Sequence, residues 1–199
     1  MSSESPFTGP VCARCPRVLG ASCCEVTGDE QLATLTLVDV RRISAWLRRP
    51  SSRFVEVEWL DDEQARAYEA RRPLYRGYFR AGPRRLTLKR VAGEARTHCV
   101  FLSPGQGCSL PADVRPTACR LYPFEQLPDG RWSLQVGRYG GPEAARGATD
   151  ACLAVEESND LGDVLRLFSV TREEVEVLGT QLAQEVEEHA YMTTKGVEP

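Results

Sequence analysis

Histidine is scarce in this sequence, and several membrane and cofactor signatures are missing. With two histidines in 199 residues, no Ser/His/Asp arrangement and no HExxH motif is visible, so nothing indicates a hydrolase of these classes. The chain also has no GxGxxG loop of the kind that binds dinucleotides. No stretch approaches about eighteen consecutive apolar residues, which argues against a transmembrane helix. The opening MSSESPFTGP has no secretion signal, and we therefore expect a cytoplasmic protein.

The composition is that of one soluble globular domain. Hydrophobic residues make up 42% and charged residues 27%, with a mean hydropathy of -0.34, which argues against a disordered or fibrous chain. Charge is uneven: residues 39–96 hold fifteen Arg or Lys against eight acids, whereas residues 143–198 hold four against thirteen. Because the net charge is -3 and no nucleic-acid motif surrounds the arginines, we expect no nucleic-acid partner and interpret the basic block as solvated surface.

Cysteine is the residue that stands out. Eight are present, at Cys12, Cys15, Cys23, Cys24, Cys99, Cys108, Cys119 and Cys152. An even number suggests disulfides in a secreted protein, but cytoplasmic thiols stay reduced, and clustered cysteines there more often bind metal or act in catalysis. All eight are therefore candidate metal ligands.

Hydrophobic spacing and turn residues predict an α+β fold, in which short hairpins and cysteine-rich loops surround a metal site and helices flank them. Residues 1–30 should be loop-like because Pro and Gly interrupt any longer period. Capping boxes at Thr36 and Thr171 open two predicted helices. The other expected elements are helices over 61–72 and 161–168, an extended segment over 54–59, hairpins of 84–91 with 97–102 and of 121–127 with 131–136, a short helix or turn over 115–124, and a loop over 137–150. We expect residues 1–11 to be disordered, 12–155 to hold the metal, and 156–199 to add helices to the same domain.

The first four cysteines form two pairs. A CxxC turn such as Cys12-Ala-Arg-Cys15 can point two sulfurs at one ion. The adjacent Cys23 and Cys24 have diverging side chains, so one can join the first pair while the other faces a second site or the core. A redox disulfide at the CxxC is less favoured, because no βαβ pattern accompanies it.

The later cysteines strengthen the metal hypothesis. Cys99, Cys108 and Cys119 lie nine to eleven residues apart and would converge when the hairpin and its following loop fold back. His98 neighbours Cys99 on the predicted strand and should point to the opposite face. His189 lies among glutamates in the last helix, and we interpret it as a solvated residue.

The whole pattern resembles a known family. The CxxC, the Cys-Cys pair, Cys99, Cys108, the segment Arg115-Pro-x-x-Cys119-Arg-x-Tyr-Pro-Phe124 and the final Cys152 are similar to the YkgJ-type cysteine-cluster family, also called the CxxCxxCC zinc- or iron-chelating domain. The resemblance implies a bacterial cytosolic domain that chelates zinc or iron. The flagellin lysine-N-methylase looks related through the same cysteines. This chain departs from the family pattern in the seven residues between Cys15 and Cys23.

Arg115 and Arg120 flank Cys119 and are candidates for supporting the cofactor. Each could donate hydrogen bonds to thiolate sulfur or to the backbone around it, or could form only a surface salt bridge. Gly107 is expected to allow the turn that brings Cys108 back toward Cys99.

Two function classes follow from the sequence. Eight thiolates could hold two Zn(Cys)₄ sites, one [4Fe–4S] cluster with four cysteines to spare, or one shared cluster. The preferred hypothesis is a metal-binding module, with zinc or an iron–sulfur cluster in a mainly structural role and an unknown protein partner. The alternative is an iron–sulfur enzyme that modifies proteins, such as a protein lysine methyltransferase.

Overall fold

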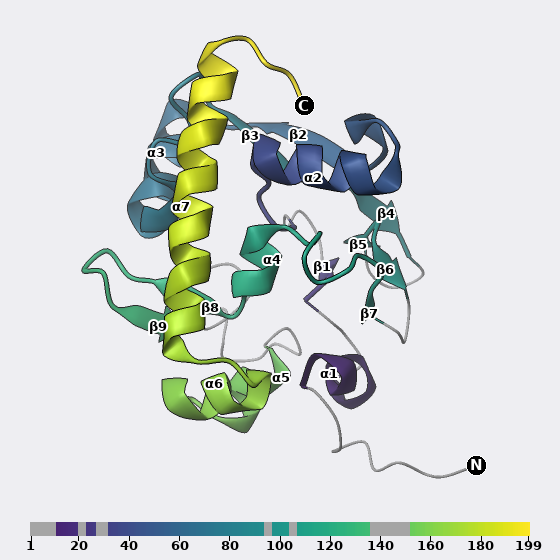
Figure 1. Ribbon diagram of the computed structural model, residues 1–199, viewed down its shortest axis with the longest axis vertical. Helices are drawn as coiled ribbons and strands as arrows, with labels where there is room; N and C mark the ends of the chain where they lie inside the picture. The colour runs from purple at the N-terminus through teal and green to yellow at the C-terminus, as the bar shows by residue number, and fades with distance from the viewer. Residues whose placement is uncertain (1–10, 20–22, 27–31, 94–96, 104–106, 136–151) are drawn as a thin grey trace.

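The computed structural model describes residues 11–19, 23–26, 32–93, 97–103, 107–135 and 152–199. Helices surround several small antiparallel sheets, as expected for the α+β class (Figure 1). The helices are α1 (Val11–Leu19), α2 (Leu37–Leu47), η1 (Ser51–Arg53), α3 (Asp62–Arg71), η2 (Pro73–Tyr75), α4 (Thr117–Leu121), α5 (Leu153–Glu157), α6 (Leu161–Phe168) and α7 (Arg172–Thr194). The strands are β1 (Glu25–Val26), β2 (Val55–Trp59), β3 (Arg84–Leu88), β4 (Arg90–Ala92), β5 (Thr97–Cys99), β6 (Leu102–Ser103), β7 (Gly107–Cys108), β8 (Phe124–Gln126) and β9 (Trp132–Leu134). In these segments no helix combines the length and apolarity needed to cross a membrane.

Local capping signals place the two main helices. The Thr36 side chain accepts a hydrogen bond from the Asp39 backbone, and the Asp39 carboxylate accepts one from the Thr36 backbone, so the predicted box opens α2. Thr171 and Glu174 form the same reciprocal pair at the start of α7. Both helix starts predicted from the sequence are therefore confirmed.

The strands pair less locally than the sequence indicates. The expected strand over residues 84–91 is interrupted at Lys89: β3 pairs with β2, and only β4 forms the predicted hairpin with β5. The expected strand over 97–102 is likewise broken after Cys99, and β6 pairs with β7. The second predicted hairpin is confirmed as β8 with β9. The expected loop over 137–150 lies outside the described residues.

The expectation of a loop over the first thirty residues is wrong for residues 11–19 and 25–26, which form α1 and β1, whereas residues 23–24 form a turn. Val11 begins helix α1, which continues through Pro16 although proline has no N–H to donate. Tertiary contacts stabilise this helix: Val11 is buried in the protein interior, and Arg14 forms a two-point ion pair with Glu157 at the end of α5. Residues 1–10 of the expected disordered segment lie outside the described residues.

Two hydrophobic clusters form the core. The first cluster lies under α2 and the β2–β3 sheet and includes Leu35, Ile43, Phe54 and Leu86. The second cluster lies among η2, α4, β8, β9 and the C-terminal helices and includes Tyr75, Tyr78, Phe124, Val164 and Leu182. Helix α7 runs along the molecule from α6 to α2 and so spans both halves (Figure 1).

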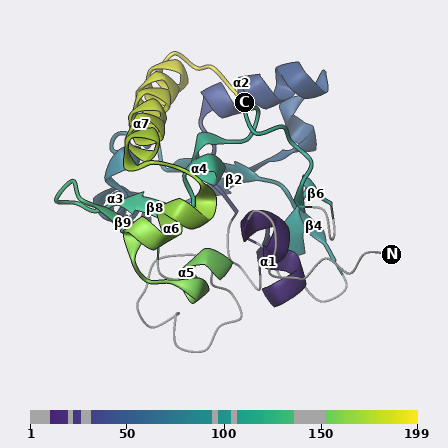
Figure 2. The same ribbon diagram turned by 60° about the horizontal axis from the view of Figure 1, so that its bottom comes forward.

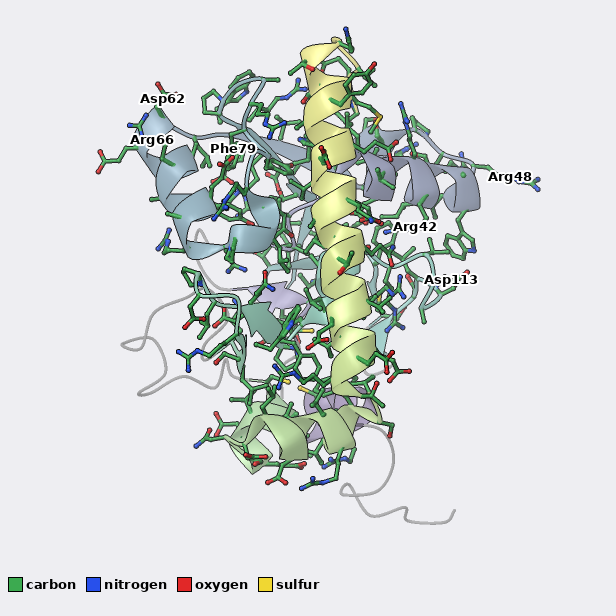
Figure 3. All side chains as sticks on the ribbon, turned by 60° about the vertical axis from the view of Figure 1, so that its left-hand side comes forward. Arg42, Arg48, Asp62, Arg66, Phe79 and Asp113 are labelled. Atoms are coloured by element: carbon green, nitrogen blue, oxygen red, sulfur yellow. The ribbon has the colours of Figure 1, made fainter. Side chains whose placement is uncertain are left out.

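A buried polar network joins α2, α4 and α7. Asp39 is fully buried; its carboxylate accepts a hydrogen bond from the Thr117 backbone N–H at 3.1 Å and forms a short ion pair with Arg42. Arg42 also donates to Glu185 of α7 at 2.9 Å, and Figure 3 shows it beside that helix. Burial, followed by the nearby Glu185, raises the pKa of Asp39 to about 6. The network holds the start of α4, and with it the segment that carries Cys119.

The interpretation of His189 as a solvated residue is wrong. His189 is only 2% exposed, and its ring stacks on Tyr78 at 4.1 Å between centroids. Its Nδ1 accepts a hydrogen bond from the Leu37 backbone N–H at 3.1 Å, which requires an unprotonated nitrogen. Burial and then the charge of Arg84 lower the pKa of His189 to about 4. The histidine is therefore a neutral core residue that connects α7 to the start of α2.

Acidification should destabilise the protein through His189. Because the folded pKa lies below the ordinary value of 6.5, the unfolded chain binds the proton more readily, and stability is lost as the pH falls from 6.5 toward 4. The histidine should contribute about 2–3 kcal/mol of this loss. His189→Gln keeps an acceptor for Leu37 but cannot titrate, so its unfolding free energy should fall less between pH 7 and pH 4.5 than that of the wild type. Equal losses in urea titrations would contradict this role.

Candidate metal centre

All eight cysteines line a single cavity of about 410 Å³. They come from α1, from the turn before β1, from β5, β7 and α4, and from the residue before α5. None of them forms a disulfide. The cavity lies between the two hydrophobic clusters, since its lining includes Leu88 and Phe101 of the first and Tyr75 and Phe168 of the second. Residues distant in sequence thus bring every thiol of the chain to one place.

Helices α1 and α5 form one wall of the cavity. Arg14 lies between Cys12 and Cys15 on α1 and donates to both carboxylate oxygens of Glu157, at 2.5 and 2.9 Å. Figure 2 shows these two helices side by side at the end of the molecule that comes forward. Cys152 is the N-cap residue of α5. The ion pair therefore fixes the CxxC helix against the segment that carries Cys152.

Small antiparallel pairings form the opposite wall. The Cys99 backbone N–H donates to the Cys24 carbonyl at 2.7 Å, which joins β5 to the turn that carries Cys23 and Cys24. Both of these adjacent cysteines line the same cavity, and Cys24 also packs against the first hydrophobic cluster, in keeping with the expectation that one of the two faces the core. Cys108 pairs with Leu102, and Gly107 beside it has a positive φ of 91°, as expected for this turn.

Burial keeps several of the thiols protonated in the protein without metal. Burial raises the pKa values of Cys99 and Cys152 to about 12 and that of Cys119 well above its ordinary range. A hydrogen bond with Cys23, followed by burial, raises the pKa of Cys24. Burial also raises the pKa of Cys12 to about 11, while Arg115 acts in the opposite direction.

Mutual repulsion between thiolates also places Cys23 centrally. The charge of the Cys23 thiolate contributes to the raised pKa values of five other thiols, those of Cys12, Cys24, Cys99, Cys119 and Cys152. Cys23 is therefore within electrostatic range of cysteines on both walls of the cavity.

The thiols share a cavity but do not converge on a point. Within the described segments, no three Cys, His, Asp or Glu side chains are arranged closely enough to hold one metal ion. Tetrahedral zinc at about 2.3 Å from each sulfur requires four sulfurs within about 4 Å of one another. The convergence expected for Cys99, Cys108 and Cys119 is thus seen only as a shared cavity, and metal ligation would require the thiols to move inward.

The two candidate arginines differ in position. Arg115 lines the cavity; its Nε donates to the Leu110 carbonyl at 3.0 Å and its Nη2 reaches the Cys108 carbonyl at 3.5 Å. Arg120 is partly buried but does not line the cavity. His98 does not line it either. Arg115 thus holds the backbone around Cys108, whereas the structure does not bring Arg120 to the thiols.

Arg115 and Arg120 provide a matched pair for testing support of the metal. Removing a group that orients metal ligands costs about 10–100-fold in metal affinity, and we expect a loss of this size for Arg115→Gln. Arg120→Gln removes an arginine charge five residues further along the chain, outside the cavity lining, and should leave the metal affinity unchanged. Competition with a chromophoric chelator measures both variants. Equal losses, or no loss for Arg115→Gln, would count against this role.

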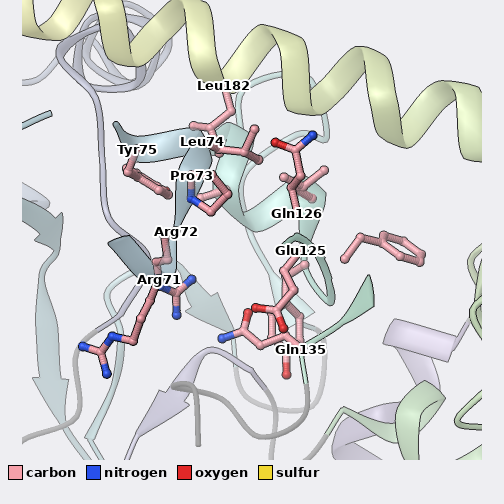
Figure 4. A pocket seen from close by; sticks show the side chains of 13 residues that line it. Arg71, Arg72, Pro73, Leu74, Tyr75, Glu125, Gln126, Gln135 and Leu182 are labelled. Carbon is pink, nitrogen blue, oxygen red and sulfur yellow. The ribbon is translucent and has the colours of Figure 1, made fainter. Parts of the chain in front are cut away.

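The cavity extends beyond the cysteines in a way that the sequence did not reveal. Tyr68, Arg72 and Arg85 contribute to its lining, and the two guanidinium groups lie 5.5 and 5.2 Å from the centre of the Tyr68 ring. A second cavity of about 60 Å³ adjoins it and is shown in Figure 4. The two cavities share Arg72, Tyr75, Ala118, Tyr122 and Gln135. No spacing rule could identify these residues as one group, because they come from several elements spread between positions 68 and 135.

Comparison of the chain with protein-family models, with curated proteins and with solved structures finds no match in any of the three. The resemblance to the YkgJ-type family therefore stays an expectation from the cysteine pattern. Any functional argument must come from the residues around the cavity.

Proposed function

We propose that this protein binds metal through the cysteine thiolates of its central cavity. The observation that carries the proposal is the gathering of all eight cysteines, from six separate segments, around one cavity between the two hydrophobic clusters. Thiolate sulfur is a ligand for zinc and for iron–sulfur clusters, and this donor set fits either. The candidate ligands are the eight residues Cys12, Cys15, Cys23, Cys24, Cys99, Cys108, Cys119 and Cys152.

The volume of the cavity favours more than one metal atom. Single ordered waters occupy about 30 Å³ each, so a space of about 410 Å³ greatly exceeds what one ion needs. Two zinc ions with four thiolates each would use all eight cysteines, whereas one [4Fe–4S] cluster would use four of them and would occupy more of the cavity than a single ion. In either case the metal would connect α1 and α5 on one wall with β5, β7 and α4 on the other, which supports a mainly structural role.

The alternative, an iron–sulfur enzyme that modifies proteins, has one observation in its favour. Such an enzyme needs space for a co-substrate beside its metal, and the cavity extends past the cysteines to Tyr68, Arg72 and Arg85. We give preference to the structural role because the ion pair and strand pairings that surround the thiols hold separate segments together.

The identity of the metal is tested by anaerobic purification followed by elemental analysis and a visible spectrum. A colourless protein with about two zinc per chain would support two four-thiolate sites. A brown protein with iron and acid-labile sulfide would support the iron–sulfur form of the proposal and keep the enzyme alternative open. Protein that carries neither metal, and takes up neither zinc nor iron after reduction of its thiols, would overturn the proposed function.

A further inference from the structure

We propose that the arginine-lined end of the cavity, at Arg72 and Tyr68, binds the carboxylate or phosphate group of a small organic anion. This inference goes beyond metal binding and does not depend on it, because neither residue is a candidate metal ligand. The proposal is carried by a partly buried arginine whose guanidinium has no hydrogen-bonding partner among the described residues and which is held over an aromatic ring where two cavities meet.

Arg72 has a charge that the described part of the protein does not satisfy. Arg72 is partly buried, and its guanidinium makes no hydrogen bond and no ion pair with any described residue. The carboxylate of Glu125 is within electrostatic range of Arg72: burial raises its pKa and the charge of Arg72 lowers it, but the two form no ion pair. Removing a guanidinium from water without a partner is unfavourable, and an oxyanion that pairs with two of its N–H groups would relieve that cost.

The neighbouring side chains fix the geometry of this end. The Tyr68 hydroxyl shares a hydrogen bond of 2.7 Å with Thr34 Oγ1, which orients the ring below Arg72. Arg85 lies over the same ring, but its charge is paired with Glu58. Of the two arginines over the Tyr68 ring, Arg72 is therefore the one whose charge is available to a ligand. Tyr68 and Arg85 are held in place by their own partners, Thr34 and Glu58.

The size and lining of the cavity fit a small organic molecule. Ligand pockets typically measure about 300–1,000 Å³ and combine apolar walls with a few polar groups. The cavity of about 410 Å³ falls in this range, and Leu88, Phe101 and Phe168 supply apolar walls. Because the thiols line the same space, a bound anion would lie in the same cavity as the metal.

The proposal is tested by titrating the full-length, anaerobically purified protein with benzoate and phenyl phosphate, followed by saturation-transfer NMR. Benzamide, which has the same ring but no charge, should bind at least about tenfold more weakly than benzoate or phenyl phosphate. Whichever of the two anions binds more tightly identifies the oxyanion that the site prefers. Binding of benzamide as strong as that of both anions would overturn the proposal.

Variants place the anion at Arg72. Arg72→Gln should weaken anion binding by at least about tenfold, and Arg72→Lys, which keeps the charge but loses the two-point geometry, should show a smaller loss. Arg66→Gln is the matched control, because Arg66 lies on α3, the helix whose C-cap residue is Arg72, and points away from the molecule (Figure 3). Metal content is measured on every sample, so a failed metal proposal is recognised separately from a failed anion site. Unchanged anion binding in both Arg72 variants would rule the site out.

Discussion

Removal of the metal should lower the thermal unfolding midpoint of this protein by at least about 20 °C. A structural metal contributes on the order of 10 kcal/mol to folding, and each kcal/mol corresponds to about 2–4 °C for a chain of this size. The metal would connect the two walls of a cavity that lies between the two hydrophobic clusters, and this connection is lost when the metal is removed. The measurement is calorimetry of metal-loaded and chelator-treated protein under reducing conditions.

The loss of structure should also be local. The turn at Cys24 is connected to β5 by a two-residue pairing, and β6 and β7 pair over only two residues, so we expect Cys99 to Cys119 and α1 to lose amide protection first. Helix α2 and the β2–β3 sheet have a cluster of their own and should keep protection longer. An unfolding midpoint that stays constant after complete metal removal would show that the metal is not structural.

Single cysteine-to-serine substitutions should have the second largest effect, on metal affinity. Losing a residue that only orients metal ligands lowers metal affinity by about 10–100-fold. Losing a thiolate that contacts the metal should lower it further, and we expect a decrease in metal affinity of at least about 100-fold. Cys23 and Cys119 should be among the most sensitive, because Cys23 is within electrostatic range of both walls and Cys119 is held by the Asp39 network. Metal per chain and affinity are measured for all eight variants.

His98→Gln is the control for this series. It removes a potential metal ligand that is adjacent to Cys99 on β5 but does not line the cavity, so metal binding should be unchanged. Cys99, Cys108 and Cys119 are the decisive positions: if serine at each of the three leaves metal content and affinity intact, the thiol cavity is not the metal site.

Local signals allowed the sequence to predict some elements accurately. The helices that begin after Thr36 and Thr171 depend on residues within one turn of each other, so the capping boxes suffice to place them. Helix α1 is different, because its formation depends on the Arg14 contact with Glu157, 143 positions away. The β2–β3 pairing likewise depends on contacts across an intervening helix, which strand alternation does not reveal.

For the candidate site, too, the sequence predicts what depends on residue type or local spacing but not what depends on contacts between distant segments. Residue type alone indicated all eight cysteines, but their shared cavity results from six segments whose arrangement no spacing determines. The burial of His189 could have been predicted, since Leu182, Val186 and His189 are spaced by four and three residues and therefore lie on one helix face. The surroundings of Arg72 could be predicted only in part: Tyr68 lies four residues before it, but Arg85 and Gln135, which line the same cavity, come from other parts of the chain.

X-ray absorption at the zinc or iron edge of the metal-loaded protein tests the central claim most directly. If the cavity thiolates hold the metal, the nearest shell consists of sulfur alone, at about 2.3 Å, with four sulfur atoms per metal. An iron–sulfur cluster would add a metal–metal distance to the same sulfur shell. A nearest shell of nitrogen or oxygen at about 2.0–2.1 Å would contradict the claim, because the cavity offers eight thiols and neither histidine of the chain lines it.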